Sequence, residues 1–574
     1  MKKIVFTLLV AAWGCVLQAQ LPYLARNDGK VQLMVDGKPF LMLCGELSNS
    51  ATGSARSMAS VWQRMADKNL NAVLAAMSWE LVEPEEGRYD FALLDSLVCG
   101  ARKAGLKVGL LWFGSWKNGL STYAPAWVKT DQGRFPLARF KDGRKMNTLS
   151  TFGKETMEAE AKAFGAMMAH LRDTDTDHTV ILVQVENEMG TLDPLSLYAD
   201  VPNKAMRDYS PVANKAFGGQ VPQALTDYLG RHRKDLHPAI CKAWEDNGAK
   251  RKGTWEEVFG QGMPANEAAD WQQDYPYLTE EIFMAWHYAA YVERIAMAGK
   301  QAYPLPLYVN AWLKQSGGRE PGRYPSGGPQ AHVIDIWRAA APSVDFIAPD
   351  IYIVDYFDEV CRAYTASANP LFIPETKGDP ASAARAFYAF GRYDALCYAP
   401  FAIESNSLFS GSDVNDKSYD RVYGCLKNLV PYILEYRGTG RMDGLFIDSR
   451  KTTDSLEMGG YKFSVEPFSA GMSMAVAGIE VEEDEKKHTA AGMLVIELQE
   501  GDFLVAGYGD MLVKIGKGSR HKADNVGLLS VDEISFTPQG RMLAHRLNGD
   551  ETSSGGVVIP VREAKVFRVK MYAY

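Results

Sequence analysis

Apolar runs and segments of helical periodicity alternate along most of the chain. The apolar runs are short and nearly continuous, which is typical of strands buried on both faces of a parallel sheet. They occupy residues 41–46, 72–79, 107–114, 180–190 (a run that ends in an acidic Glu-Asn-Glu tip), 305–312, 346–352, 371–375 and 395–404. The segments between them have helical apolar spacing and occupy residues 59–68, 91–107, 155–172, 280–299, 332–340, 357–366 and 381–390. Eight strand–helix units in series predict an α/β fold, a (β/α)8 TIM barrel.

Two stretches depart from this repeat. Residues 191–277 are polar and aromatic and follow the fourth strand, so they are expected to form an insertion at the barrel mouth. From about residue 441, glycine-bounded alternating segments such as 461–465, 493–498, 511–515 and 565–569 indicate antiparallel strands. We therefore expect a catalytic barrel over residues 20–440 and a β-sandwich-like domain over residues 441–574.

The first residues have the pattern of an export signal. Two lysines precede an apolar run from residue 4 to residue 13, and a small residue, Ala19, stands near its end. This pattern predicts a signal peptide over residues 1–19 and a periplasmic or extracellular protein. Gly14-Cys15 raises a lipid-anchored alternative, which Trp13 and the apolar residues after Cys15 disfavour. No later stretch is long and apolar enough to be expected to span a membrane.

Charge and composition narrow the partners. The 574 residues carry a formal net charge of −8 with mixed signs, which gives no reason to expect nucleic acid or an anionic membrane. The nine histidines show no metal-ligand spacing, so neither a metal nor another cofactor is expected. The cysteines form no Cys-x-x-Cys pair, and free thiols are the expectation. An oligomer is possible.

Candidate chemistry gathers at the carboxyl ends of the predicted strands. Glu188 follows the fourth strand and Glu375 ends the seventh, which places two carboxyl groups across the barrel mouth. Glycoside hydrolysis needs such a pair, one neutral acid and one ionised partner. Apolar surroundings favour Glu188 as the acid, and the neighbouring Lys377 favours an ionised Glu375. The alternative is two rim acids held in salt bridges.

Other polar and aromatic residues at strand ends are candidates for substrate contacts. After the third strand, Trp116 offers a stacking face, Lys117 a cation and Asn118 an amide. Lys117 could bind a carboxylated sugar or simply face solvent. The remaining candidates are Glu46, Asn310, Trp312 and Glu404. An oligosaccharide or polysaccharide is therefore the expected partner.

Three segments resemble a known family of glycosidases. Residues 184–190, Gln-Val-Glu-Asn-Glu-Met-Gly, resemble the acid/base motif of glycoside hydrolase family 35 β-galactosidases. Residues 79–91 are similar to the Trp-x-x-x-Glu-Pro-x-x-Gly-x-Tyr-Asp-Phe segment that families 35 and 42 share, and residues 125–127 resemble the Pro-Ala-Trp that follows strand three. The likeness covers residues 31–405 and is closest to a bacterial branch with a β-rich C-terminal domain.

The resemblance implies a retaining exo-β-glycosidase that releases terminal β-galactose from plant glycans by double displacement. It implies that Glu188 is the acid/base, Glu375 the nucleophile, Asn187 the contact to the sugar 2-hydroxyl, and Tyr352 the residue that orients the nucleophile. The family's usual Cys-Ala-Glu-Trp on strand three is Phe-Gly-Ser-Trp here, at residues 113–116. A different terminal sugar (an arabinoside, xyloside or uronide) and a non-catalytic glycan-binding barrel therefore stay open as alternatives.

Overall fold

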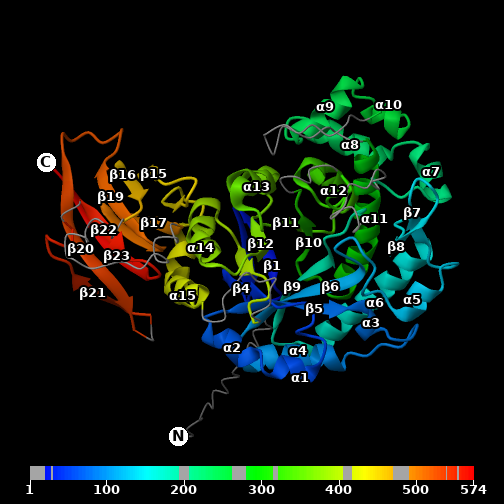
Figure 1. Cartoon of the computed structure of the whole chain (residues 1–574), viewed down its shortest axis with the longest axis horizontal. Helices are drawn as coiled ribbons and strands as arrows, with labels where there is room; N and C mark the ends of the chain where they lie inside the picture. Colours follow the sequence, from blue (N-terminus) through cyan, green and yellow to red (C-terminus); the bar gives the residue numbers. More distant parts are fainter. Residues whose placement is uncertain are drawn as a thin grey trace, which may run out of the picture.

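Eight parallel strands form a closed ring in the first part of the chain (Figure 1). The computed structural model describes residues 20–27, 30–192, 206–261, 279–314, 321–404, 416–468, 490–537, 540–552 and 555–574. The ring strands are β4 (Met42–Glu46), β5 (Ala72–Ser78), β6 (Lys107–Lys117), β9 (Val180–Asn187), β10 (Leu307–Trp312), β11 (Phe346–Asp350), β12 (Phe372–Thr376) and β13 (Cys397–Pro400). β11 meets β12 through a hydrogen bond of 2.9 Å from the Ile351 backbone N–H to the Glu375 carbonyl oxygen, which closes the ring. The predicted (β/α)8 barrel is confirmed.

Helices surround the ring and cover its outer face. They are α1 (Ala55–Ala59), α2 (Trp62–Asp67), α3 (Trp79–Val82), α4 (Ala92–Lys103), α5 (Ala126–Thr130), α6 (Lys154–Thr174), α11 (Thr279–Ala302), α12 (Ile334–Ala340), α13 (Phe357–Thr365), α14 (Pro380–Tyr393) and α15 (Ser418–Tyr436). Every residue of β9 is buried, because its side chains meet the helices on one face and the barrel interior on the other. Inside the ring, Tyr308 stacks on Phe346 with ring centroids 5.0 Å apart, and Phe372 packs against both. The interior is thus a packed core, so a ligand must bind at its rim.

A short antiparallel sheet at the start of the chain packs against this core. It consists of β1 (Tyr23–Asn27), β2 (Lys30–Val35) and β3 (Lys38–Pro39). The Asp36-Gly37 turn between β2 and β3 has positive φ at both residues, as a type I′ hairpin requires. Leu33 and Val35 bury their side chains among those of the barrel interior. The predicted signal peptide, residues 1–19, lies outside the described residues.

The described residues of the expected insertion after β9 form four helices. They are α7 (Pro211–Phe217), α8 (Gln223–His232), α9 (Pro238–Asp246) and α10 (Trp255–Phe259), and α8–α10 lie together at the upper right of Figure 1. Their apolar side chains join the main core, and the His237 backbone N–H donates a hydrogen bond of 2.7 Å to Asp335 on α12. Residues 193–205 and 262–278 are outside the described part of the chain. A small β7–β8 ribbon (Leu137–Arg139 and Lys145–Leu149) lies close to α7.

The last part of the chain forms an antiparallel sandwich, at the left of Figure 1. One sheet has the order β14-β17-β18-β23-β20-β21 and the other β15-β16-β19-β22. Their strands are β14 (Met442–Ile447), β15 (Asp454–Met458), β16 (Tyr461–Glu466), β17 (Ala491–Gln499), β18 (Asp502–Tyr508), β19 (Met511–Lys517), β20 (Val526–Phe536), β21 (Met542–Arg546), β22 (Gly556–Ile559) and β23 (Ala564–Ala573). Phe463 and Phe503 lie in the core between the sheets. Across the described residues, we find no helix with the length and apolarity that a bilayer span needs.

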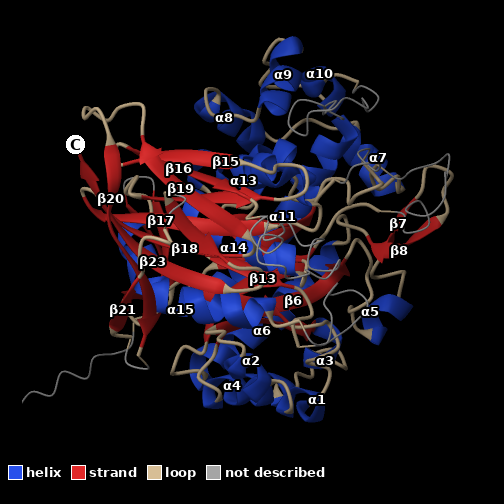
Figure 2. Cartoon of the chain, turned by 60° about the vertical axis from the view of Figure 1, so that its left-hand side comes forward, coloured by secondary structure: helices blue, strands red, loops and turns tan. Residues whose placement is uncertain are grey.

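The sandwich packs directly on the barrel. Leu494 and Leu504 of the larger sheet share one core with helix α14, so the two parts are joined by apolar contact. Figure 2 shows α14 beside the strands of this sheet. Gly492 on β17 lies against the backbone of Ala384 on α14, and a Cβ at this glycine would collide with the Ala384 carbonyl oxygen. Glycine therefore allows the strand and the helix to approach closely.

Gly492→Ala is expected to destabilise the protein through this contact. Because neither backbone segment can move freely, the change should lower the free energy of unfolding by about 1–3 kcal/mol. Gly516→Ala on β19 is the matched control, since a Cβ there has no heavy atom within 4 Å. Urea unfolding of both variants measures the difference. Equal stabilities of the two variants would show that the approach of β17 to α14 is not close in solution.

Candidate active site

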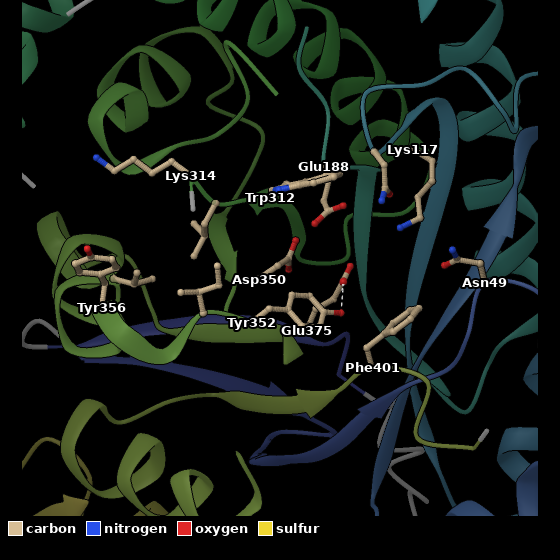
Figure 3. Close-up of a pocket in the computed structure, with 14 residues that line it drawn as sticks. Asn49, Lys117, Glu188, Trp312, Lys314, Asp350, Tyr352, Tyr356, Glu375 and Phe401 are labelled. Atoms are coloured by element: carbon tan, nitrogen blue, oxygen red, sulfur yellow. Dashed lines mark hydrogen bonds between the residues drawn. The ribbon is translucent and has the colours of Figure 1, made fainter. Parts of the chain in front are cut away.

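A cavity of about 470 Å³ opens at the carboxyl ends of the barrel strands (Figure 3). Side chains from several strand ends and the loops after them line it. They are Asn49, Lys117, Asn118, Glu188, Trp312, Leu313, Lys314, Asp350, Tyr352, Ile353, Tyr356, Val360, Glu375 and Phe401. Carboxyl groups gather at one side, and the apolar side chains of residues 313, 353 and 360 form another part of the wall. The cavity is therefore a pocket with a polar floor and a partly apolar wall.

The end of β9 separates its two glutamates. Glu186 and Glu188 both have positive φ, at 65° and 46°, a conformation that costs about 1–3 kcal/mol for a residue with a side chain. The Glu188 backbone N–H donates to Asn310 Oδ1 at 3.0 Å, which holds this turn. Glu186 is fully buried and its carboxylate accepts the backbone N–H groups of Ser115 and Trp116, each at 2.9 Å. Glu188 instead faces the cavity.

The hydrogen bonds of the Glu186 carboxylate also shape the end of β6. The pairing of β6 with β9 shifts register between Trp112 and Lys117, so β6 carries extra residues there, and Glu186 binds the backbone of this bulge. The bulge brings Lys117 to the cavity, where its ammonium group donates to Asn187 Oδ1 at 2.7 Å. Burial by itself would lower the pKa of Lys117. The nearby carboxyl groups outweigh burial and raise that pKa, so the ammonium stays charged.

Glu375 on β12 accepts hydrogen bonds from three sides. The Tyr352 hydroxyl donates to Glu375 Oε2 at 2.8 Å (Figure 3). Asn310 Nδ2 and Asn187 Nδ2 reach Glu375 Oε1 at 3.4 and 3.5 Å. Glu375 is 4% exposed, so these donors replace water around it. Donors of this kind stabilise an ionised carboxylate, the form that a nucleophile needs.

Glu188 has the surroundings of a proton donor. Burial, followed by the charge of Glu375, raises the pKa of Glu188 to about 7. A carboxyl group with such a pKa holds its proton in a large share of molecules at neutral pH. A carboxyl group with this raised pKa faces, across the cavity, a second carboxyl group that accepts three hydrogen bonds, and a pair of this kind suits acid–base work on one bond.

The separation of the carboxyl groups is short. One oxygen each of Glu188, Asp350 and Glu375 lie within 4.8 Å of one another. Such a group could also hold a cation. Lys117 already places a positive charge beside these acids. The expectation that no metal takes part stays a prediction.

Most residues predicted to bind substrate lie at this site. Lys117, Asn118, Trp312 and Tyr352 line the cavity. Asn187 and Asn310 are fully buried beneath it, and both touch Glu375.

Two predictions of substrate contact do not fit the structure. Trp116 is fully buried, packs edge-on against Tyr288 and Tyr291, and donates its indole N–H to the Leu149 carbonyl oxygen at 3.1 Å. Its side chain belongs to the core because the β6 bulge turns it away from the cavity. The Glu404 carboxylate does not line the cavity. It accepts hydrogen bonds from the backbone N–H and the hydroxyl of Ser48, and so joins two loops.

Glu46 occupies an intermediate position. It is 1% exposed and is not part of the cavity lining, yet its charge interacts with Glu375 and Lys117. Burial, followed by Glu375, raises the pKa of Glu46 well above its ordinary value. Neither carboxyl oxygen of Glu46 has a hydrogen-bond partner among the described residues. Glu46 therefore lies close to Glu375 but outside the cavity lining.

Sequence reasoning missed several lining residues. The most important is Asp350, at the end of β11, which is 3% exposed and lies between the two glutamates. Its position at a strand end was the available signal. The others follow strands in segments without a recognisable sequence pattern, with Val360 on helix α13; they are Asn49, Leu313, Lys314, Ile353, Tyr356, Val360 and Phe401.

Comparisons with known proteins agree with this geometry. Residues 51–215 match the family model of glycoside hydrolase family 42, described as beta-galactosidase, and residues 419–558 match a domain of unknown function, DUF5597. A search of curated proteins finds no match. The family match, on a (β/α)8 barrel with paired carboxyl groups at its mouth, identifies the chain as a glycoside hydrolase of the barrel type.

Solved structures with a similar fold include three glycosidases. The catalytic domain of a beta-amylase from Paenibacillus polymyxa has a TM-score of 0.45 and 11% identity over 66% of this chain and 95% of its own. Beta-galactosidases from the psychrophilic Marinomonas ef1 and from Rahnella sp. R3 each have a TM-score of 0.42, with 14% and 15% identity over 68% and 70% of this chain. This chain spans 60% and 57% of the length of those two enzymes.

Proposed function

We propose that the protein is an exported retaining exo-β-glycosidase that releases terminal β-galactose from plant glycans. The observation that carries the mechanism is the separation of at most 4.8 Å between an oxygen of Glu188 and one of Glu375. Retaining glycosidases have carboxyl groups about 5–5.5 Å apart, and inverting enzymes need roughly 6.5–9.5 Å to admit a water. The family 35 likeness of residues 184–190 favours Glu188 as the acid/base, and export rests on the pattern of residues 1–19.

The proposed reaction has two displacements. Glu375 attacks the anomeric carbon, while Glu188 gives its proton to the departing glycosidic oxygen. The resulting glycosyl ester on Glu375 is then attacked by water, and Glu188 takes the proton of that water. The sugar leaves with the anomeric configuration it had in the substrate. Asn187, whose amide is held by Lys117, is placed to contact the sugar 2-hydroxyl beside the nucleophile.

The charges of the pocket favour a neutral sugar. Asp350 and Glu375 line the cavity with Glu188, and Glu46 lies close behind. Two lysines line the cavity. Lys117 lies among these acids and is engaged by Asn187 and by the surrounding carboxyl groups, and the Lys314 side chain points away from them (Figure 3). A uronide carboxylate would add a further negative charge, so the uronide alternative is disfavoured. Galactose comes from the family match and resemblance, and an arabinoside or xyloside is the second candidate.

A panel of nitrophenyl β-glycosides tests this function. We expect the galactoside to be cleaved with the highest kcat/KM, followed by the arabinoside and xyloside, with the glucuronide slowest. Proton NMR of the first turnovers should show the β anomer of the released sugar. Release of the α anomer would overturn the retaining mechanism. Sugar binding without hydrolysis of any glycoside would instead support a non-catalytic glycan-binding barrel.

A further inference from the structure

The pocket holds one carboxyl group more than the proposed reaction uses. Asp350 has an oxygen within 4.8 Å of those of both Glu188 and Glu375. Double displacement needs a nucleophile and an acid/base, and neither role is left for a third acid. Lys117 is the cation whose charge acts on all three. An ionised Asp350 would be repelled by the charge of Glu375, and by that of Glu188 once Glu188 has given up its proton, which favours a proton on Asp350.

The hydrogen bonds around Asp350 show where its proton lies. The oxygen of the Asn310 amide accepts the Glu188 backbone N–H, so its NH₂ group points the other way and donates to Asp350 Oδ2 at 2.9 Å. Asp350 Oδ1 has no donor among the described residues, although it is buried. An oxygen of Asp350 and one of Glu188 lie within 4.8 Å of each other. A buried carboxylate oxygen without a donor is costly when it is charged, which favours a proton on Asp350 Oδ1 with the Glu188 carboxyl group as the nearby acceptor.

We propose that Asp350 is a positioning residue, a neutral carboxylic acid that donates a hydrogen bond to Glu188 and stabilises the Glu188 carboxylate after it has released its proton. The inference rests on the proposed function, because it assigns Asp350 a role through the acid/base. Asp350 forms no bond to the substrate in this account. Its effect is to hold the Glu188 carboxyl group in place and to favour its ionised form.

Every proton is accounted for in both displacements of the proposed reaction. In the first step the proton of Glu188 goes to the leaving oxygen, and the Asp350 proton stays on Asp350. The hydrogen bond from Asp350 then has a charged acceptor and becomes stronger. At this stage Glu375 is a neutral ester, so Glu188 carries the negative charge of the group. In the second step Glu188 takes a proton from water, and the starting state returns.

The surroundings of Asp350 agree with a neutral acid. Burial, followed by the charges of Glu375 and Glu188, raises the pKa of Asp350 well above its ordinary value. The titratable groups that face it from the neighbouring elements are Glu46 on β4, Lys117 on β6, Glu188 after β9, Tyr308 on β10, Tyr352 after β11, Tyr364 on α13 and Glu375 on β12. Acids outnumber the cation in this set, which favours a proton on Asp350.

The pH dependence of kcat/KM for Asp350→Asn and Asp350→Ala tests the proposal. In the wild type the active form has a protonated Glu188, so kcat/KM for a nitrophenyl β-glycoside should fall as the pH rises through about 7. The asparagine can still accept a hydrogen bond from Asn310 and donate one to Glu188. The pH at which kcat/KM falls on the alkaline side, here called the alkaline limb, should therefore stay within about half a pH unit of the wild type. The alanine lacks the donor, and its limb should move upward by roughly one pH unit.

Other outcomes overturn the proposal. A limb that moves downward in both variants would mean that Asp350 is ionised and repels the charge of Glu188, and an unchanged limb in both would mean that it does not act on Glu188. If Asp350→Ala does not fold, the direction seen in Asp350→Asn decides between a neutral and an ionised Asp350. Asp67→Asn, at an exposed aspartate on α2, controls for loss of charge outside the pocket. Failure of the wild type to hydrolyse any glycoside would instead refute the proposed function.

Discussion

Glu375→Gln is expected to abolish turnover, with kcat/KM lower by roughly 10⁴-fold or more. The amide is nearly the same size as the carboxylate but cannot attack the anomeric carbon. The Tyr352 hydroxyl and the Asn310 amide bind different oxygens of Glu375, and the glutamine keeps one of these acceptors, so the loss of one hydrogen bond should leave the fold preserved. Steady-state kinetics with the best nitrophenyl β-glycoside measures the loss. Glu404→Gln is the matched control, because this strand-end glutamate lies outside the cavity lining and its substitution should leave kcat/KM within about tenfold.

Azide separates a missing nucleophile from a damaged pocket. In Glu375→Ala the small anion can enter the space left by the carboxylate and attack the anomeric carbon directly. A single displacement inverts the centre, so the product should be the α-glycosyl azide, identified by NMR. A β-glycosyl azide from this variant would show that another residue forms the covalent intermediate. Equal losses in Glu375→Gln and Glu404→Gln would also refute the assignment.

The barrel itself could be predicted because its strands are buried on both faces. A nearly continuous apolar run such as residues 180–185 is typical of a strand with no solvent-facing side, and eight such runs separated by amphipathic segments leave one common architecture. The site residues Glu188 and Glu375 follow from the same logic, since polar groups at strand ends must face the crevice. The family resemblance then assigned them roles that position alone leaves open.

Local backbone geometry accounts for the predictions that failed. Glu186 and Glu188 stand two residues apart, which in a regular strand would place both side chains on the same side. The positive φ at both positions breaks this alternation, so one carboxyl group holds the β6 bulge and the other faces the cavity. That bulge also turns Trp116 into the core and presents Lys117 to the site. Neither the bulge nor the left-handed turns leave a pattern in the side-chain types.

Asp350 and Asn310 illustrate a different limit. The strand-end argument that selected Glu46 and Glu404 applied equally to Asp350, but it cannot rank acids by their distance from the nucleophile. Asn310 was expected to bind sugar, and the structure places it as a link between Glu188, Asp350 and Glu375. Polar residues meet because strands far apart in the sequence lie side by side in the fold. The pattern of residue types along a single sequence does not show which of them meet.

Glu188→Ala is expected to slow hydrolysis by an amount that depends on the leaving group. A sugar alkoxide is a poor leaving group and needs a proton in the transition state, so release from a glycan should fall by roughly 10²–10⁴-fold. Dinitrophenolate departs without a proton, so the first displacement on a dinitrophenyl glycoside should be nearly unchanged, and the glycosyl-enzyme should accumulate because water lacks its base. Pre-steady-state kinetics would show this as a burst of dinitrophenol.

Added azide should restore turnover of the activated substrate in Glu188→Ala, because the anion attacks the glycosyl-enzyme without needing a base. The product is expected to be the β-glycosyl azide, since this attack is the second inversion at the same carbon. Glu186→Gln serves as the comparison, because Glu186 holds the β6 backbone. Its substitution should slow hydrolysis by a similar factor for every leaving group. An equal loss of activity on glycan and dinitrophenyl substrates in Glu188→Ala would mean that Glu188 does not protonate the leaving oxygen. Asp350 would then be the candidate proton donor, because it is the other acid close to Glu375 in the pocket.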